Sequence, residues 1–326
     1  MMLNSPLSIA PMIDWTYTHF RVLMRLLAPN ALLYTEMQTS AAIQHQPQRA
    51  LDFHLMEMPL ALQIGGSDPK ILADCAREAV AAGYVEINLN LGCPSSRVIA
   101  GQFGACLMNN SPRVASCIQA IKQAVNIPVT AKIRLGIDHQ DSYAFFADFV
   151  HMLVDSGCDK IIVHARKAWL TGLNPKQNRT IPPINYEYVY QVKQEIPLIP
   201  VVINGQIQTI EAIKEHLNHV DGVMLGRLAC QNPYAIAVLH HELHPEVALP
   251  ARADVLRQYL AISQNIQSQN QRKIPLSRVL KPLFNIMHGL KGSSAWKASL
   301  MDIKDSDTQN NFRLLEQALE CFQFTA

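Results

Sequence analysis

A short apolar run rich in β-forming residues recurs eight times along this chain, and polar turns and amphipathic segments separate the runs. Strands that alternate with helices predict a parallel sheet with helices packed against it. Eight such units within roughly 240 residues favour a (β/α)8 TIM barrel, in the α/β class, over an open doubly wound sheet. No G-x-G-x-x-G sequence follows any run, which further disfavours the open sheet. The expected strands are residues 7–10, 32–35, 60–64, 85–89, 129–133, 160–164, 201–204 and 222–226.

The pattern changes after Pro233, because no further β run follows and the remaining segments have helical periodicity. We therefore expect a barrel domain over residues 1–243, followed by a small C-terminal helical domain over residues 244–326. The helices expected in the second domain are residues 252–267, 276–288, 294–300 and 310–322.

Charge is nearly balanced overall, with 28 basic and 26 acidic residues, but it is segregated along the chain. Residues 87–137, 160–186 and 255–301 contain five, five and seven Lys or Arg, and no Asp or Glu. This segregation predicts a basic surface and a polyanionic partner. The competing interpretation is chance clustering of solvated Lys and Arg side chains.

The seven cysteines are odd in number, scattered, and contain no Cys-x-x-Cys pair. This usage predicts a reduced, cytoplasmic compartment and no metal cluster. No apolar run is long enough to span a bilayer, so we expect no membrane partner. The first residues lack the charged and apolar regions of a signal peptide.

The segment 86–94 alternates apolar and polar residues, breaks at Gly92, and presents Cys93 before Pro94. Such alternation indicates a strand, and Gly and Pro end it. Cys93 therefore should stand at the carboxyl end of a strand, near the polar side chains of Asn88 and Asn90. Reactive cysteines occur in such polar surroundings, whereas a structural cysteine is usually found within an apolar run.

Chemistry in an eight-stranded barrel takes place where strands end at the carboxyl face. Two of these ends, Asn204–Gly205 and Gly226–Arg227, contain the glycine turns that commonly cradle a phosphate after the seventh and eighth strands. Arg227 would add a bidentate donor. The other ends carry Pro11–Met12, Glu36, Gln63, Asn88, Asn90, Cys93, Lys132, Arg134 and His164.

Lys132 has two possible roles: a Schiff-base nucleophile, or a cation holding the electron-rich edge of a flavin. A Schiff-base lysine would not require Gln63, His164 and Cys93 nearby. The Gln63 amide offers both a donor and an acceptor, which suits a uracil-like flavin edge. His164 alone would more often be a satisfied core histidine, but its place at the sixth strand end favours a functional role.

Motifs spaced from the first strand to the eighth resemble those of the tRNA-dihydrouridine synthases. They occupy residues 10–12, 34–37, 62–65, 86–94, 101–108, 132–136, 162–166, 203–205 and 224–227, the 86–94 element being the most specific. Residues 164–179 resemble the A subfamily, whose members modify the tRNA D-loop at positions 20 and 20a. The resemblance covers the barrel well and the helical tail loosely. One departure is Gln206, where relatives often carry a small residue.

The resemblance implies that residues 1–243 bind FMN and catalyse, and that residues 244–326 bind tRNA. NADPH would reduce the FMN, a hydride would pass to C6 of uracil, and Cys93 would protonate C5. The implied cofactor-binding residues are Pro11, Met12, Gln63, Lys132, His164, Asn204, Gly205, Gly226 and Arg227. The implied RNA-binding residues are Asn90, at the target uridine, with Lys176, Arg179, Arg278 and Lys281. The expected partner is tRNA, and the expected state is a monomer.

Three alternatives stay open at this point. The first is an FMN barrel oxidoreductase acting on a free pyrimidine, in the manner of dihydroorotate or dihydropyrimidine dehydrogenases; it would leave the acid-free tail unexplained. The second is a non-catalytic RNA-binding protein, which would leave the polar residues at the strand ends without a function. The third is a Schiff-base aldolase that uses Lys132.

Overall fold

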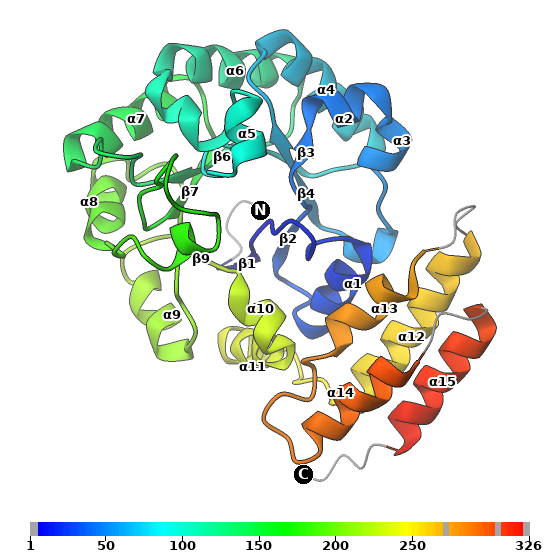
Figure 1. Cartoon of the computed structure of the whole chain (residues 1–326). Coiled ribbons are helices and arrows are strands. Elements are labelled where there is room, and N and C mark those ends of the chain that lie inside the picture. The colour runs from blue at the N-terminus through cyan, green and yellow to red at the C-terminus, as the bar shows by residue number, and fades with distance from the viewer. Residues whose placement is uncertain (1–5, 270–273, 304–307, 322–326) are drawn as a thin grey trace. The chain divides into compact units, whose positions relative to one another are not determined.

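The computed structural model of this chain describes residues 6–269, 274–303 and 308–321. Within these residues, eight parallel strands close into a barrel with helices outside it, which confirms the predicted fold class (Figure 1). The ring runs β2–β1–β9–β8–β7–β6–β5–β4 and closes through pairing of β2 with β4, while the short strand β3 (Gln38–Thr39) extends β4. The barrel strands are β1 Leu7–Ile9, β2 Leu32–Tyr34, β4 Leu60–Gly65, β5 Glu86–Asn90, β6 Val129–Arg134, β7 Lys160–His164, β8 Val201–Asn204 and β9 Gly222–Leu225.

Local signals in the sequence set the bounds of the barrel helices. In α4 (Pro69–Ala82), the Asp68 carboxylate accepts from the Ile71 N–H at 3.0 Å, Pro69 occupies the first turn, and Gly83 ends the helix at φ 104°. The other helices of the barrel are α2 Ser40–His45, α3 Pro47–Ala50, α5 Ser96–Ala100, η3 Gly104–Asn109, α6 Ser111–Ala124, α7 Tyr143–Asp155, η4 Gln177–Arg179, α8 Glu187–Glu195 and α9 Ile210–Leu217.

The register of the parallel strands brings the polar strand ends to one end of the barrel. Asn90 pairs with Lys132, and His164 pairs with both Arg134 and Asn204. Because side chains alternate between the two faces of a strand, positions two apart on one strand share a face. One apolar cluster of the barrel consists of Ala10, Leu32, Tyr34, Ala61, Ile162, Val202 and Met224.

The described residues divide into two compact units. The barrel unit contains the residues up to Ile13, Leu32–Phe53 and Pro59–Gly226, and the helical unit contains Asp14–Ala31, His54–Met58 and the residues from Arg227 onward. The expected domain boundary after residue 243 stays a prediction. The helical unit comprises α1 Thr18–Leu27, η2 Leu55–Glu57, α10 Arg227–Gln231, α11 Pro233–Leu243, α12 Arg252–Gln269, α13 Leu276–Leu280, η5 Lys281–Leu283, α14 Ser293–Asp302 and α15 Thr308–Cys321.

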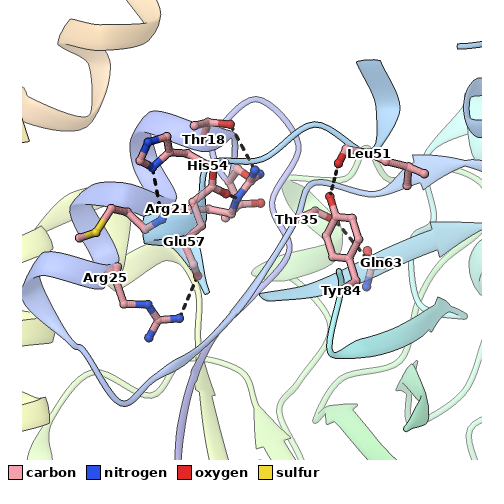
Figure 2. Close-up of polar contacts among 11 residues, drawn as sticks. Thr18, Arg21, Arg25, Thr35, Leu51, His54, Glu57, Gln63 and Tyr84 are labelled. Carbon is pink, nitrogen blue, oxygen red and sulfur yellow. Dashed lines mark hydrogen bonds and ion pairs between the residues drawn. The ribbon is translucent and has the colours of Figure 1, made fainter. Parts of the chain in front are cut away.

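A buried polar cluster joins α1 to η2 inside the helical unit (Figure 2). The Arg21 guanidinium forms an ion pair with the Glu57 carboxylate, and both side chains are buried. Arg25 donates to the Glu57 carbonyl at 3.0 Å, as Figure 2 shows. It also donates to the Ala31 carbonyl at 2.7 Å. Breaking such a pair from one side is costly, because it leaves an uncompensated buried charge. These contacts fix the 54–58 segment to α1.

One helix expected from the sequence is interrupted. Residues 276–288 form α13, the 3-10 turn η5 and then further turns, not one continuous helix. Pro282 supplies the reason, because its ring removes a backbone donor and obstructs the preceding turn of an α-helix. Phe322, where the last expected helix ends, lies outside the described residues. Within the described part of the chain, no helix has the length and apolar character needed to cross a membrane.

Candidate active site

Cys93 lies in the loop that follows β5, at the carboxyl end of the barrel. The Asn90 side-chain oxygen accepts from the Gly92 N–H at 3.2 Å and from the Cys93 N–H at 3.0 Å. The Cys93 carbonyl accepts from the Ala105 N–H at 3.0 Å. The Cys93 side chain is half-buried, and its sulfur lies 3.6 Å from the Ser95 hydroxyl. The loop thus holds the thiol in place without sealing it in the core.

Gly104 allows the backbone to approach this loop closely. Its φ is +76°, and a Cβ there would lie 2.7 Å from the Cys93 carbonyl oxygen and 2.3 Å from a Val98 methyl carbon. Only glycine satisfies both the conformation and the space. The 101–108 segment therefore helps to place Cys93.

Lys132 lies on β6 with a half-buried side chain. Its ammonium donates to the Asn204 side-chain oxygen at 3.1 Å, and the Asn204 amide nitrogen donates to the Met224 carbonyl at 2.7 Å. Burial of the ammonium, and next the nearby Arg134, lower the pKa of Lys132 to about 7. The structure thus brings Lys132 and Asn204 together at the ends of β6, β8 and β9.

Arg134 was not among the residues assigned a role from the sequence. Its guanidinium donates to the Gly92 carbonyl at 2.9 Å and to the Asn178 carbonyl at 2.9 Å. Burial lowers the pKa of Arg134 to about 10. Arg134 therefore ties the Cys93 loop to the 167–179 loop. The sequence could have indicated that Arg134 belongs to the site, because it lies two residues after Lys132 and therefore on the same face of the strand.

The Gln63 side chain is buried within the barrel. Its backbone N–H donates to the Thr35 hydroxyl at 3.1 Å (Figure 2), and its side-chain oxygen accepts from the Asn90 amide at 2.8 Å. The Gln63 amide nitrogen donates to Asn88 at 2.8 Å. Residues Gln63 and Asn90, predicted to serve a cofactor and a uridine, are thus direct neighbours.

Gly205 follows β8 with φ +130°, and a Cβ there would lie 3.0 Å from the His164 ring. The ring of His164 therefore packs against this turn. The Tyr186 hydroxyl donates to the Gly205 carbonyl at 2.7 Å. Gln206, the departure noted in the sequence, accepts from Arg166 at 2.5 Å through its side-chain oxygen. The longer side chain at this position is thus accommodated by Arg166.

Pro11 and Met12 follow β1, and both are half-buried. A Cβ at Gly226 would lie 3.7 Å from the Met12 sulfur, so the ends of β1 and β9 are close together. Arg227 follows Gly226 as the first residue of α10, and it belongs to the helical unit.

Lys176 and Arg179 are both exposed and lie at the end of the 167–179 loop. The loop is folded around the buried Asn178, whose amide oxygen accepts from the Trp169 N–H at 2.7 Å and whose amide nitrogen donates to the Leu173 carbonyl at 3.1 Å. The two cations are therefore presented by an ordered loop.

Arg278 and Lys281 lie together in the helical unit, against residues 14–17. The Arg278 guanidinium lies 5.1 Å from the centre of the Tyr17 ring, and the Lys281 ammonium lies 4.4 Å from the centre of the Trp15 ring. Lys281 also donates to the Asp14 carbonyl at 2.7 Å. Trp15 and Tyr17 are neighbours that sequence reasoning missed, because they precede their partners by more than 250 residues.

The residues at the barrel mouth fit an electron-rich, anionic cofactor. Among the described residues, Lys132 and Arg134 donate to amide and carbonyl oxygens and form no ion pair with a carboxylate. Arg134, together with Lys132 below its pKa of about 7, creates a positive potential, which favours a negatively charged or electron-rich ligand. The turn at Gly205 exposes backbone that a ligand can approach closely, because the residue has no side chain there. A flavin mononucleotide has both features, an electron-rich ring edge and a phosphate.

The family model described as Dihydrouridine synthase (Dus) matches residues 8–323 of this chain. A Synechocystis sp. protein named tRNA-dihydrouridine(20/20a) synthase is 48% identical over 300 residues, covering 91% of this chain and 89% of that protein. Proteins of the same name are 47% identical in Shewanella oneidensis, covering 92% and 89%, and 46% identical in Salmonella typhimurium, covering 96% and 94%.

A solved structure of 2-naphthoyl-CoA reductase with 2-naphthoyl-CoA superposes on this chain with a TM-score of 0.55 and 9% identity. The superposition covers 76% of this chain and 51% of that chain, so this chain spans about half of that protein's length. At this identity the likeness supports the fold alone.

Proposed function

The chain belongs to the dihydrouridine synthase family, and from this premise we propose that it reduces uridine to 5,6-dihydrouridine at position 20, position 20a or both in the tRNA D-loop. The observation that carries the proposal is the 46–48% identity, over about nine tenths of the chain, to proteins named for that reaction. Family membership favours this function over the free-pyrimidine dehydrogenase, the RNA-binding platform and the aldolase that the sequence alone left open.

We propose FMN as the cofactor, because the donor set at the barrel mouth suits it. Bound reduced flavin would supply the hydride for C6 of the uracil, with NADPH as the source of reducing equivalents. Lys132 and Gln63 would hold the electron-rich ring edge, and His164 would pack beside it. The remaining proposed contacts are the backbone at Pro11 and Met12, and Asn204, Gly205, Gly226 and Arg227 at the phosphate.

Cys93 would act as the general acid. Its thiol would hold a proton at sulfur and give it to C5 of the uracil, which completes saturation of the C5–C6 bond. The contacts of its backbone with Asn90 and Ala105 would keep the sulfur at one position while the base approaches. Asn90 would contact the target uridine with the amide hydrogen that its bond to Gln63 leaves over.

Four cations, of which Lys281 is half-buried and the other three are exposed, would bind the tRNA. Lys176 and Arg179 on the barrel unit, and Arg278 and Lys281 on the helical unit, would contact phosphates, and residues 244–326 would form the tRNA-binding domain. A uridine stacked in folded tRNA must be flipped out of the stack to reach the barrel mouth. A protein surface that binds the tRNA by its shape and phosphates would hold it while the base is flipped out. We place the protein in the cytoplasm, where its substrate is made, and expect it to act as a monomer.

The test uses the purified protein with FMN, NADPH and an unmodified tRNA transcript. Dihydrouridine is then mapped by position. The proposal predicts product at position 20, 20a or both, and none elsewhere. Absence of dihydrouridine from the tRNA, together with reduction of free uracil or orotate, would replace the proposal with the free-pyrimidine dehydrogenase.

A further inference from the structure

A continuous chain of buried hydrogen bonds runs through the barrel unit to the Cys93 loop. We propose that Thr130 and Asn88 are positioning residues, which set the direction of the Gln63 and Asn90 side-chain amides through this chain. The inference rests on the proposed function, since Gln63 and Asn90 are the residues assigned there to the cofactor and the uridine.

The chain begins at the buried Glu86 carboxylate. Lys160 donates to one carboxylate oxygen at 2.6 Å, while Tyr34 at 2.7 Å and Thr130 at 2.6 Å donate to the other. All four side chains are buried. Burial, and next the Glu86 charge, hold the pKa of Tyr34 well above its usual value, so its hydroxyl keeps the proton that it donates. A carboxylate paired with an ammonium only accepts, which fixes this end of the chain.

The donor-to-acceptor direction of each hydrogen bond then fixes that of the next. Thr130 gives its single proton to Glu86, so its oxygen is left to accept from the Asn88 amide nitrogen at 2.8 Å. The Asn88 oxygen therefore faces Gln63 and accepts from the Gln63 amide nitrogen at 2.8 Å. The Gln63 oxygen is left to accept from the Asn90 amide nitrogen at 2.8 Å.

The other end of the chain imposes the same direction independently. The Asn90 oxygen meets the backbone N–H groups of Gly92 and Cys93, which only donate. An obligatory acceptor at Glu86 and obligatory donors at Cys93 therefore agree on one orientation for every amide between them. Reversing one amide would set donor against donor and acceptor against acceptor on its two sides. Each buried group left without a partner costs roughly 1–3 kcal/mol, so the single orientation is strongly favoured.

The consequence concerns which atoms face a ligand. With the chain intact, the Gln63 and Asn90 nitrogens each keep one further hydrogen at a fixed position. The Gln63 oxygen keeps one further lone pair, whereas the Asn90 oxygen already accepts from two backbone N–H groups. The same chain holds the Cys93 backbone through Asn90. Disturbing it at Thr130 would alter the surroundings of the cofactor and of Cys93 without touching the cations that bind RNA.

The experiment replaces Thr130 by Val, which keeps the shape and removes the hydroxyl, with Thr130→Ser as the matched control that restores it. In the FMN-loaded full-length protein, T130V should lower kcat about tenfold or more, change KM for tRNA less than about twofold, and shift the visible spectrum of the bound flavin. T130S should match the wild type in all three.

A second variant guards against misfolding of the first. Asn88→Leu, which is similar in size, removes both the acceptor toward Gln63 and the donor toward Thr130, so it should show the same split between kcat and KM. A folded T130V or N88L protein with wild-type kcat and flavin spectrum would overturn the inference. Wild-type protein that makes no dihydrouridine would instead contradict the proposed function, while the flavin spectra of the variants would still decide the inference.

Discussion

Replacing Gly104 by Ala tests how firmly the structure places Cys93. The added Cβ would lie 2.7 Å from the Cys93 carbonyl oxygen and 2.3 Å from a Val98 methyl carbon. A left-handed residue other than glycine costs roughly 1 kcal/mol, and overpacking against backbone costs a further 1–3 kcal/mol. We therefore expect G104A to lose about 2–4 kcal/mol of unfolding free energy. Because the clash pushes on the Cys93 backbone, kcat should fall about tenfold or more.

Gly83 provides the matched control, because its φ is also left-handed, at +104°, and its Cβ would meet only the Phe53 ring at an ordinary 3.6 Å. G83A should lose about 1 kcal/mol and keep full kcat. The measurements are denaturant unfolding and dihydrouridine formation at saturating tRNA. If G104A were no less stable than G83A and as active as the wild type, the account of how the loop is held would be wrong.

Three further predictions concern protonation and RNA binding. The pKa of Lys132 is near 7 in the free protein, so its ammonium loses its proton as pH rises above that value. The affinity for FMN should therefore fall by up to about tenfold per pH unit above pH 7. A Kd for FMN that does not change between about pH 6 and 9 would contradict this prediction. Burial lowers the pKa of His19 to about 4, so between about pH 6.5 and 4 the unfolded chain binds a proton that the folded chain does not. Roughly 3 kcal/mol of unfolding free energy should therefore be lost as pH falls through that range. His19→Leu should reduce this loss of stability at acid pH, and an unchanged loss would refute the prediction. Reversing the charges of Arg278 and Lys281 should weaken tRNA binding and reduce its salt dependence, whereas unchanged affinity at low salt would remove these residues from the RNA site.

The barrel could be predicted because its signals are local. Short apolar runs and the polar turns after them mark each strand, and the parallel topology then brings the strand ends together. Lys132, Asn204 and His164 were predicted to be near one another on that ground, and the register places them so.

What the sequence did not reveal depends on contacts distant along the chain. Arg134 acquires its role from the carbonyls of Gly92 and Asn178, which only the folded loops supply. The order of the buried amides depends on strand register, which no single segment encodes. The α1 and η2 segments both lie between barrel strands in the sequence, yet both belong to the helical unit, where buried Arg21 and Glu57 join them to each other. Pro282, by contrast, was a local signal that should have ended the expected helix.

The most direct test of the central claim is a single turnover by Cys93→Ala protein that carries reduced flavin, mixed with unmodified tRNA. The account predicts wild-type binding of cofactor and tRNA, and dihydrouridine formation slowed by at least about 100-fold, because the proton donor at C5 is gone. Dihydrouridine formed at the wild-type rate would show that the thiol at the end of β5 is not the acid.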